Sequence, residues 1–488
     1  MRANTLTVAA AAAMAVFAGT APAAADVTIS KSATQNMSCS GGVCSPTAAG
    51  AVLNVSDLET LLASGNVEVT TTGSSVQADN IDIDAALTWS TANTLSLDAY
   101  DSIVVESAVT VLGLGGLAIT DNDGGSGGVF SFGKKGHVTF ENLSSGLTID
   151  GTVYTLVSSV ASLASAIQEN PAGAYALAAN YDASKDGAYT NSPIPTTLTG
   201  TVQGLGNMIS NLKIRYHNKK ITYYVGLFSD VGSGGALENL RMRGLHLTVS
   251  GRAYSGGMVG INEGTLFGDE VSGYSRNAGG GLASGNSTTG TIISSSADVT
   301  MDNGGGGFIA ENAGSISLSH ADGNATGDGG EGAFIGDNEG AISQSYATGS
   351  GYGAGFAGYS ESDGQNTVEI DNSYATGAAY DAGFVGDDGD GNLHATVSSS
   401  YSTGAVAEGE AGFVCEAAFD DFTYDYWDTT TSGTDQGTCY NGNIAGVTGL
   451  TSKELKAKLP QGFDPTIWAI DPKINKGFPY LINNPPSK

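Results

Sequence analysis

The chain has 488 residues, of which 72 are glycine, and 49 acidic side chains outnumber 19 lysines and arginines to give a formal net charge of −30. A surface with this charge is repelled from phosphate, so the composition excludes a protein that binds nucleic acid. Apolar residues form 40% of the chain, which is sufficient for a core, and the acidic surface favours solubility.

Residues 1–25 have the pattern of an export signal. Arg2 precedes an apolar run over residues 6–18, and small residues lead up to a cleavage site between Ala25 and Asp26. The apolar run is too short to cross a bilayer, since a transmembrane helix needs about 20 apolar residues, and no later segment is apolar enough. We therefore expect an exported mature chain without a membrane span. It would lie outside the cell or at the cell surface, with the periplasm as the alternative.

Four cysteines fit an oxidising compartment. Cys39 and Cys44 enclose a short loop, while Cys415 and Cys439 flank a later region of the chain. Several pairings are possible, and proximity in the sequence favours the Cys39–Cys44 and Cys415–Cys439 disulfides. The chain contains no Cys-x-x-Cys spacing, which disfavours a redox or zinc site. We interpret residues 26–52 as a leader that holds the first disulfide loop.

Residues 53–155 carry short runs in which apolar and polar residues alternate, for example at 67–69, 81–83 and 109–111. Glycine and asparagine separate these runs. Alternation of this length predicts short strands joined by turns. The breaks are too frequent for a sandwich with long strands, so we expect N-terminal β-helical coils.

A connecting module over residues 156–224 contains one predicted helix. Within 158–170, apolar residues recur at helical spacing, and Pro171 follows the last of them. These apolar residues are Val160, Leu163, Ala164 and Ile167.

Residues 225–433 repeat one phrase: a glycine or alanine, two apolar residues, a small residue, and then a turn rich in asparagine or glycine. The phrase returns every 22 to 29 residues, which is the spacing of a solenoid whose units bury their apolar residues only against their neighbours. We expect the phenylalanines of the phrase to stack inside the solenoid rather than to form a platform for carbohydrate. The first apolar residues of the copies are Met258, Leu282, Phe308, Phe334, Phe356, Phe384 and Phe413.

Four copies of the phrase carry an asparagine at the equivalent turn, namely Asn262, Asn286, Asn312 and Asn338. Aligned asparagines can stack into a ladder in which side-chain amides bond to one another. Alternatively, asparagine is there because it tolerates the left-handed backbone of a turn. The sequence leaves both interpretations open. Any ladder would be incomplete, because Ser360 takes the place of asparagine in the next copy.

The region 434–488 lacks the phrase, and we interpret it as a C-terminal cap, because a solenoid needs a structure that covers its last coil. Thr451 and Glu454 have the spacing of a capping box. This spacing predicts a short helix that ends near Leu459.

In several copies the phrase is followed by Asn-x-Gly and then by Ser-Tyr-Ala-Thr-Gly at 345–349 or Tyr-Ala-Thr-Gly at 374–377. In this it resembles the GLUG repeat of bacterial surface proteins. The segment from Leu53 to about Ile214 resembles the β-helical parts of filamentous-haemagglutinin-like exoproteins. The resemblance implies an all-β fold, a right-handed parallel β-helix, and an extracellular, adhesive role. The partner that it implies is an extracellular glycan, a surface polymer or another host or cell-surface component.

The residues offer one weak metal candidate and no cofactor. Asp387, Asp388, Asp390 and Asn392 alternate with glycine and could present oxygen ligands to calcium. The segment lacks the glycine and the glutamate of a calcium-binding loop, so a solvated acidic turn is the favoured interpretation. Residues 124–128 match G-x-S-x-G, but we expect no helix after them and assign no nucleophile there.

Catalysis is an alternative to adhesion. A polysaccharide lyase or glycoside hydrolase pairs carboxylates or sets a basic residue beside them, but pairs carry little information among 49 acidic residues. We assign no catalytic residue. We expect an adhesin-like protein that binds repetitive ligands through many weak contacts, with a polysaccharide-cleaving enzyme or a purely structural spacer as alternatives. The basic residues that could serve such an enzyme are Lys213, Arg215, Lys219, Lys220, Arg241, Arg243 and Arg252.

Overall fold

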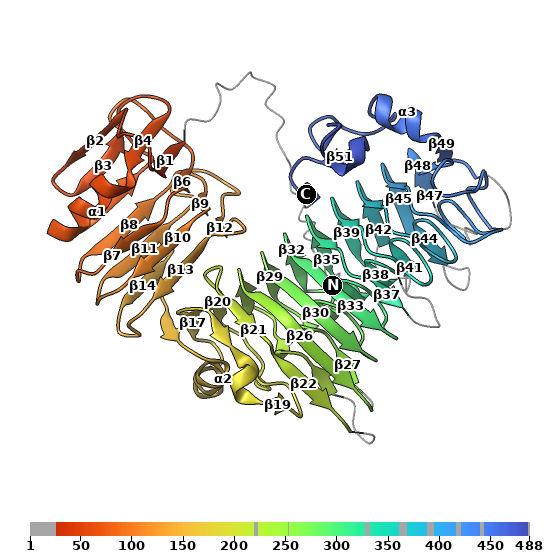
Figure 1. Cartoon of the computed structure of the whole chain (residues 1–488), viewed down its shortest axis with the longest axis horizontal. Coiled ribbons are helices and arrows are strands. Elements are labelled where there is room, and N and C mark those ends of the chain that lie inside the picture. The colour runs from red at the N-terminus through yellow and green to blue at the C-terminus, as the bar shows by residue number, and fades with distance from the viewer. Residues whose placement is uncertain are drawn as a thin grey trace, which may run out of the picture.

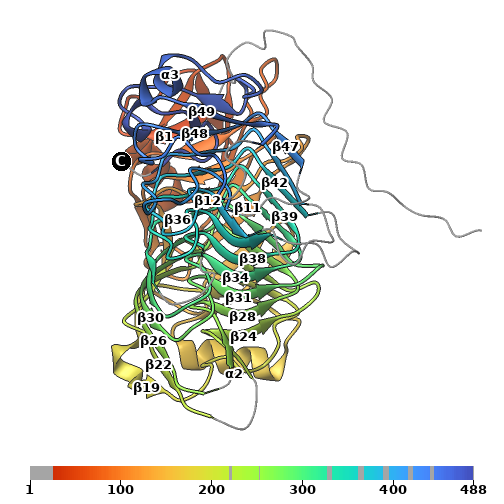
Figure 2. The same cartoon turned by 90° about the vertical axis from the view of Figure 1, so that its right-hand side faces the viewer.

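The computed structural model shows an all-β chain whose mostly parallel strands stack into a solenoid of about 15 turns. The solenoid predicted from the sequence is therefore confirmed. Figure 1 shows two arms that meet at an angle, and Figure 2 shows the strands of the second arm lying one above another. The structure describes residues 26–218, 223–251, 253–326, 332–360, 368–387, 395–415, 421–439 and 444–486.

The first arm, residues 27–153, consists of three sheets that we call the first stack. Its five-stranded sheet contains, in order, β12 (Phe130–Phe132), β9 (Ile103–Val105), β6 (Ile81–Ile83), β1 (Val27–Ser30) and β4 (Ala51–Asn54). Its three-stranded sheet contains β13 (His137–Phe140), β10 (Ala108–Val111) and β7 (Leu87–Trp89). Its seven-stranded sheet contains β15 (Thr152–Val153), β14 (Gly146–Ile149), β11 (Gly116–Thr120), β8 (Thr94–Asp98), β5 (Val67–Thr70), β3 (Val43–Pro46) and β2 (Met37–Ser40).

In the first stack, alternation of apolar and polar residues builds the core. Ile81 pairs in register with Ile103, and Ile103 with Phe130, so equivalent residues of successive coils form one buried column. Val27 belongs to the same column, because β1 pairs with β6. This corrects the predicted leader over 26–52, since its strands are part of the stack. Each of them is only four residues long, and such short runs among turn residues give a weak periodic signal.

A helix takes the place of a strand in the first coil. α1 (Val55–Ser64) packs against β7, at the end of the three-stranded sheet. Asn54 caps the helix, because its Oδ1 accepts a hydrogen bond from the backbone N–H of Ser56 at 2.9 Å. The buried face of α1, which includes Leu58 and Leu62, closes this end of the core.

The second arm, residues 155–450, has three further sheets that we call the second stack. The side sheet contains β16 (Thr155–Val157), β17 (Ala174–Leu177), β20 (Thr201–Gln203), β25 (Ala236–Glu238), β29 (Thr265–Phe267), β32 (Thr291–Ile293), β35 (Ser315–Ser317), β39 (Ala341–Ser343), β42 (Val368–Asp371), β45 (Ala395–Ser398) and β47 (Asp421–Thr423). The anchor sheet contains β24 (Phe228–Val231), β28 (Val259–Asn262), β31 (Ala283–Asn286), β34 (Ile309–Asn312), β38 (Ile335–Asn338), β41 (Ala357–Ser360) and β44 (Val385–Asp387). A separate pair contains β23 (Tyr223–Val225) and β27 (Ala253–Ser255).

The third sheet of the second stack carries the candidate site, and we call it the groove sheet. Its main path contains β18 (Tyr181–Asp182), β21 (Met208–Ser210), β26 (Arg241–Val249), β30 (Glu270–Arg276), β33 (Ser296–Asp302), β36 (His320–Ala321), β40 (Tyr346–Ala347), β43 (Tyr374–Ala375), β46 (Tyr401–Ser402), β48 (Asp425–Asp428) and β49 (Val447–Leu450). Beside this path lie β19 (Ala188–Tyr189), β22 (Lys213–Tyr216) and β37 (Ala325–Thr326).

The first apolar residues of the repeated phrase all point into the second stack. Met258, Leu282 and the five phenylalanines of the phrase have no exposed surface. The phenylalanine rings form one column, with neighbouring centroids 4.8 to 4.9 Å apart. The predicted internal stack is confirmed, and these rings are not available to carbohydrate.

The four turn asparagines form a buried amide ladder. The Nδ2 of Asn262 donates to the Oδ1 of Asn286 at 2.8 Å. Asn286 donates in the same way to Asn312, and Asn312 to Asn338, again at 2.8 Å. Of the two interpretations left open by the sequence, the ladder is therefore the one that the structure supports. It ends where Ser360 replaces asparagine.

A second buried ladder, which was not predicted from the sequence, is made of serines at the corner before successive strands of the groove sheet. The backbone N–H of Ser295 donates to the Oγ of Ser319 at 3.2 Å, and the same contact recurs from coil to coil. Carboxylates end the ladder. At one end Asp269 donates through its backbone N–H to Ser295 Oγ, and its carboxylate accepts from Leu240 N–H at 2.9 Å. At the other end the Asp425 carboxylate accepts from Ser400 N–H at 2.9 Å. The intervening steps run through Ser319, Ser345, Ser373 and Ser400.

The two stacks meet at an elbow that Arg241 holds together. Its buried guanidinium donates through Nη2 to the carbonyls of Phe132 and Gly133 in the first stack, at 3.3 and 2.8 Å. Through Nη1 it donates to Gly136 of the first stack at 3.0 Å and to Gly206 of the second at 3.2 Å. A charged, planar donor that satisfies carbonyls of both stacks fixes how they meet.

The elbow uses residues of the predicted connecting module over 156–224. Backbone N–H groups of Val138 and Phe140 donate across it to the carbonyls of Leu205 and Ala178, at 2.9 and 2.8 Å. The predicted helix is present as α2 (Val160–Glu169), and Figure 2 shows it at the opposite end of the second arm from α3. The module is not a separate connector, however, because its strands β16 to β22 belong to sheets of the second stack.

The C-terminal cap packs on the outer face of the groove sheet. It contains α3 (Ser452–Ala457), whose predicted capping box between Thr451 and Glu454 is confirmed, and a hairpin of β50 (Trp468–Ala469) and β51 (Tyr480–Leu481). The stack extends beyond residue 433, the predicted end of the array, because β49 pairs in register with β48. The cap side chains Leu455, Phe463, Trp468, Phe478 and Leu481 cover a row of tyrosines. Tyr346, Tyr374 and Tyr401 stack on one another, and Tyr426 follows in register on the next strand.

Candidate functional site

A groove of about 690 Å³ runs along the groove sheet beside the C-terminal cap. Its floor is a row of side chains from successive coils, and its wall comes from the cap. We call the floor the threonine row. It consists of Asp298, Asp322, Thr348, Thr376, Thr403 and Thr431. The cap contributes Lys473, Asn475, Lys476, Phe478 and Pro486.

The repeated Ser-Tyr-Ala-Thr-Gly segment explains why this row faces outward. In the copy over 345–349, the serine enters the buried ladder, the tyrosine packs under the cap and the alanine points into the core. Alternation along the strand then directs Thr348 outward, into the groove. The final Gly349 has no room for a side chain, because an added Cβ would lie 1.7 Å from the carbonyl oxygen of Gly323. The segment therefore produces one groove threonine in each coil that carries it.

A second hollow of about 670 Å³ lies next to the groove, between the elbow and the cap, and we call it the elbow hollow. Its floor continues the tyrosine row: Glu270 pairs in register with Ser296, and Ser296 with His320, which precedes Tyr346. Lys134 of the first stack lines the opposite side. The hollow thus brings together three parts of the chain that are far apart in sequence, and Ile474, Pro485 and Pro486 complete its lining.

His320 connects the two hollows. Its ring stacks on Tyr346 with centroids 4.8 Å apart, and its Nε2 lies 3.8 Å from an Asp322 oxygen. The other Asp322 oxygen accepts a hydrogen bond from the Thr348 hydroxyl at 2.6 Å. Burial lowers the pKa of His320, against the opposing effect of the Asp322 carboxylate. The ring is therefore largely neutral at neutral pH, and His320 adds polarity rather than charge to the site.

Charges in the two hollows balance, although the whole chain carries −30. The groove has two carboxylates, Asp298 and Asp322, and two lysines, Lys473 and Lys476. The elbow hollow has Glu270 and Lys134, and Glu270 also lies 3.5 Å from the Nε of Arg241. None of the three lysines forms an ion pair with a described residue. The site consequently offers hydrogen-bond donors and acceptors with little net charge.

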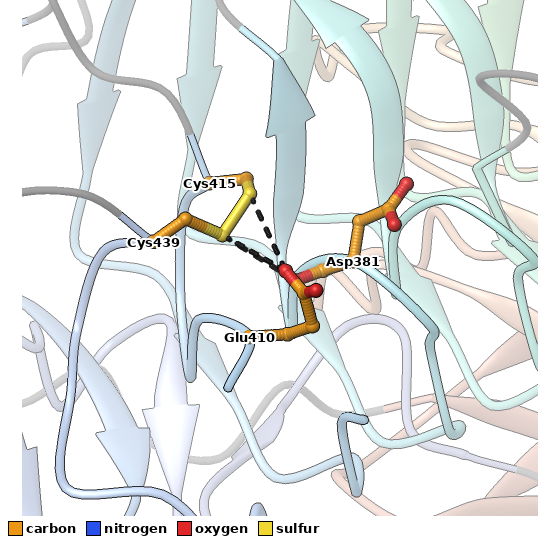
Figure 3. Close-up of a disulfide and its surroundings, with 4 residues drawn as sticks. All are labelled: Asp381, Glu410, Cys415 and Cys439. Carbon is orange, nitrogen blue, oxygen red and sulfur yellow. Dashed lines mark hydrogen bonds between the residues drawn. A yellow bond between two sulfur atoms is a disulfide. The ribbon is translucent and has the colours of Figure 1, made fainter. Parts of the chain in front are cut away.

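Both predicted disulfides, Cys39–Cys44 and Cys415–Cys439, are present. Figure 3 shows the second one beside Glu410, whose Oε2 lies 3.2 Å from Cys439 Sγ and 3.8 Å from Cys415 Sγ. Within the described ranges, these three residues are the one group close enough together to hold a metal ion. The sulfurs are bonded to each other and are not thiolates, so the group lacks two of its three ligands.

The other residues singled out from the sequence do not converge on one site. Arg241 is buried in the elbow, which removes it as a catalytic base, while Arg243 is exposed. Lys219, Lys220 and Arg252 lie outside the described residues. The calcium candidate also lies largely outside them, because Asp388, Asp390 and Asn392 are not described and Asp387 is described only as the end of β44.

Exposed tyrosines form two ring pairs on the second stack that were not predicted from the sequence, one tilted and one stacked. The rings of Tyr224 and Tyr254 are 5.7 Å apart, and those of Tyr352 and Tyr380 are 5.5 Å apart. These side chains are between 42% and 54% exposed, unlike the buried phenylalanines. The available signal was a tyrosine that stands three residues before the glycine of the phrase in three copies, and it marks a second surface able to contact a ligand.

Comparison with known proteins found no matching family model, no matching curated protein and no matching solved structure. Among the described residues, no helix is long and apolar enough to cross a membrane.

Proposed function

We propose that this protein is an exported, adhesin-like solenoid that binds a neutral, hydroxyl-rich polysaccharide along the groove beside its cap. The threonine row carries the proposal. It places a hydroxyl or carboxylate on every coil, at intervals of about 4.8 Å, the spacing of neighbouring strands. An extended glycan offers hydroxyl groups at comparable intervals, so one chain can contact many coils at once. Many weak contacts of this kind add up to useful affinity.

Charge selects among glycans. The surface as a whole is strongly acidic and repels anionic polymers such as uronate-rich or sulfated chains. The groove itself has balanced charge, and its threonines both donate and accept hydrogen bonds. A neutral polysaccharide can therefore form hydrogen bonds in the groove, and it brings no charged group that would be left desolvated and unpaired.

The localisation of the protein is part of the same proposal. The export signal pattern and two disulfides are consistent with an oxidising compartment outside the cytosol. The likeness of the repeated phrase to GLUG repeats, and of the first half to filamentous-haemagglutinin-like exoproteins, agrees with a role at a cell surface. We include the GLUG-type, haemagglutinin-like family in the proposal for that reason.

The test is binding of residues 26–488 to neutral and acidic polysaccharides in affinity gels. We expect retardation by at least one neutral polymer and by no acidic one. Thr348→Val with Thr376→Val keeps the shape of the groove floor and removes two hydroxyls, so affinity should fall roughly tenfold or more. Thr300→Val, an exposed position on β33 outside the groove, is the matched control. Equal loss in the control, or retardation by no polymer, would reject the proposal, and the latter result would favour a structural spacer.

Glycoside hydrolysis is the second candidate, and one observation favours it. Asp298 and Asp322 follow residues that pair in register, so neighbouring coils, whose backbones are about 4.8 Å apart, each carry one carboxylate into the groove. Retaining glycosidases separate their two carboxyl groups by about 5 to 5.5 Å. Release of reducing sugar from the bound polymer, abolished by Asp298→Asn and by Asp322→Asn, would establish this activity. Binding without release would leave adhesion as the function.

A further inference from the structure

We infer that the C-terminal tail, residues 482–486, sets the length of chain that the groove accepts. This inference rests on the proposed glycan binding. Pro486 lines both the groove and the elbow hollow, so the tail forms the boundary between them together with the neighbouring cap residues 473–475. With the tail in place the two hollows are separate sites, and with the tail released they form one longer site.

One side chain holds the tail on the groove sheet. The Nδ2 of Asn484 donates to the carbonyl of Ser319 at 3.1 Å and to the carbonyl of Gln344 at 3.0 Å. These carbonyls belong to consecutive coils, at the corner where each coil enters the groove sheet. Asn484 is 7% exposed, and its backbone N–H also bonds to the carbonyl of Leu481 at 3.3 Å. The tail is therefore attached at a defined point.

The residues on either side of Asn484 are held less firmly. Ile482 is 41% exposed, and Asn483 and Pro485 are also exposed. Two prolines in succession lack backbone N–H groups, so positions 485 and 486 cannot pair with a strand. The backbone N–H of Ile482 donates to the carbonyl of Ile467 in the cap at 2.8 Å. Beyond Ile482 the tail is attached to the groove sheet through one buried amide, and a small change in contacts can undo that attachment.

The position of the tail between the two hollows determines which lengths of ligand it obstructs. Pro486 lines both hollows, and their floors are continuous, because Asp298 of the groove and Ser296 of the elbow hollow stand on the same strand, β33. A chain that follows the threonine row toward the elbow meets the tail there. A short oligosaccharide fits within the groove, whereas a longer one reaches Glu270 and Lys134 only after the tail has moved.

The first experiment needs no ligand. Ser296→Cys places a thiol on the floor of the elbow hollow, in a chain whose four natural cysteines are paired. We would measure its rate of reaction with a maleimide in three backgrounds: the unchanged tail, Asn484→Ala, and a chain that ends at Ile482. Release of two hydrogen bonds should raise the rate roughly tenfold in the last two backgrounds. Asn483→Ala, the exposed neighbour, is the matched control and should leave the rate unchanged.

The second experiment uses neutral oligosaccharides of the type that the full-length chain binds, compared as hexamers and decamers. The threonine row has six positions, so a hexamer already occupies the groove, and with the tail in place the two lengths should bind with similar affinity. Asn484→Ala and the shortened chain should bind the decamer roughly tenfold more tightly than the hexamer.

The two experiments separate the two proposals. Unchanged labelling in Asn484→Ala and in the shortened chain would overturn the tail as a wall, whatever the ligand. Faster labelling with no binding of any oligosaccharide would retain the movable wall and reject the glycan. Faster labelling with unchanged length preference would reject the tail as the element that sets length.

Discussion

The two stacks solve the same packing problem with different residues. In the first stack, buried columns contain mixed apolar residues such as Ile81, Ile103 and Phe130. In the second, one residue type recurs along a column, as with the phenylalanines and the turn asparagines. Apolar packing tolerates different shapes of similar volume, whereas a polar ladder needs the same donor and acceptor in every coil. In this chain a repeated residue type therefore marks a column whose side chains stack on, or hydrogen-bond to, their equivalents in the neighbouring coils.

The first prediction concerns a substitution that disrupts the second stack, so that the first stack serves as the internal reference. Phe334→Asp places an unpaired charge in the middle of the aromatic column, which should cost roughly 5 kcal/mol or more of unfolding free energy. We expect the second stack to lose protection in hydrogen–deuterium exchange while the first stack keeps it. Tyr359→Asp, at an exposed position of β41 in the same sheet, is the control. Unchanged cooperative melting of Phe334→Asp would contradict the inward column.

The second prediction concerns a substitution at the elbow that uncouples the two stacks. Arg241→Ala leaves the carbonyls at the elbow without their charged donor and should cost about 3 kcal/mol. Because each stack has its own core, we expect one unfolding transition to become two and the distance between the arms to broaden in small-angle scattering. Arg243→Ala, an exposed position two residues along the strand, should change neither measurement. A single transition in both variants would show that other contacts fix the elbow.

The third prediction concerns the polar ladder, which the first stack lacks in its described columns. Asn312→Ala removes the acceptor of Asn286 and the donor to Asn338, both buried. Leaving these groups unsatisfied should cost about 2 kcal/mol, measured as a lower denaturant midpoint with an unchanged slope. Asn324→Ala, at an exposed asparagine of the same coil region, should have a smaller effect. Equal effects would mean that the ladder adds no stability.

The smallest predicted effect is a pH dependence of the protein's stability, which arises from a carboxylate at the elbow. Burial, with a contribution from the nearby Asp150 carboxylate, raises the pKa of Asp121 to about 6 from its ordinary 3.8. Asp121, Asp150 and, from the second stack, Glu238 line one cavity of about 270 Å³. Since the folded protein binds this proton more tightly than the unfolded chain does, stability falls as pH rises from about 4 through 6.

Asp121→Asn removes the titrating group and tests this sign. The variant should be more stable than the parent at pH 7, and the gain should vanish by pH 4, as measured by denaturant midpoints across that range. Asp435→Asn, at an exposed carboxylate of the second stack, should show no such trend. A gain that is constant with pH would contradict a titration effect.

The sequence predicted the second stack more fully than the first, because the columns of the second stack repeat one residue type. Columns such as Phe308 to Phe413 repeat one residue at a fixed interval, and that repetition is visible without a structure. β1 was missed because its partners in the five-stranded sheet, β6 and β4, resemble it only in being apolar at alternate positions. In the sequence Arg241 stands among basic residues, and nothing local indicates that carbonyls from residues 132–136 surround it.

The candidate site could be predicted only in part. The threonine of the Ser-Tyr-Ala-Thr-Gly segment was visible as part of a repeat, and its outward direction follows from strand alternation. The groove itself depends on where the cap packs, since Lys473 and Lys476 become its wall only when the cap covers the neighbouring tyrosines. Contacts between residues so far apart in sequence leave no periodic signal to detect.

The serine and asparagine ladders have a consequence for how the gene can change. Each inner coil donates to the next coil and accepts from the one before, through equivalent atoms. A whole coil can therefore be duplicated or deleted between the terminal carboxylates of Asp269 and Asp425 without leaving any rung of the serine ladder incomplete. The arm can lengthen or shorten in unit steps over generations, in the way that a polymer grows by whole monomers, and the groove would lengthen or shorten with it.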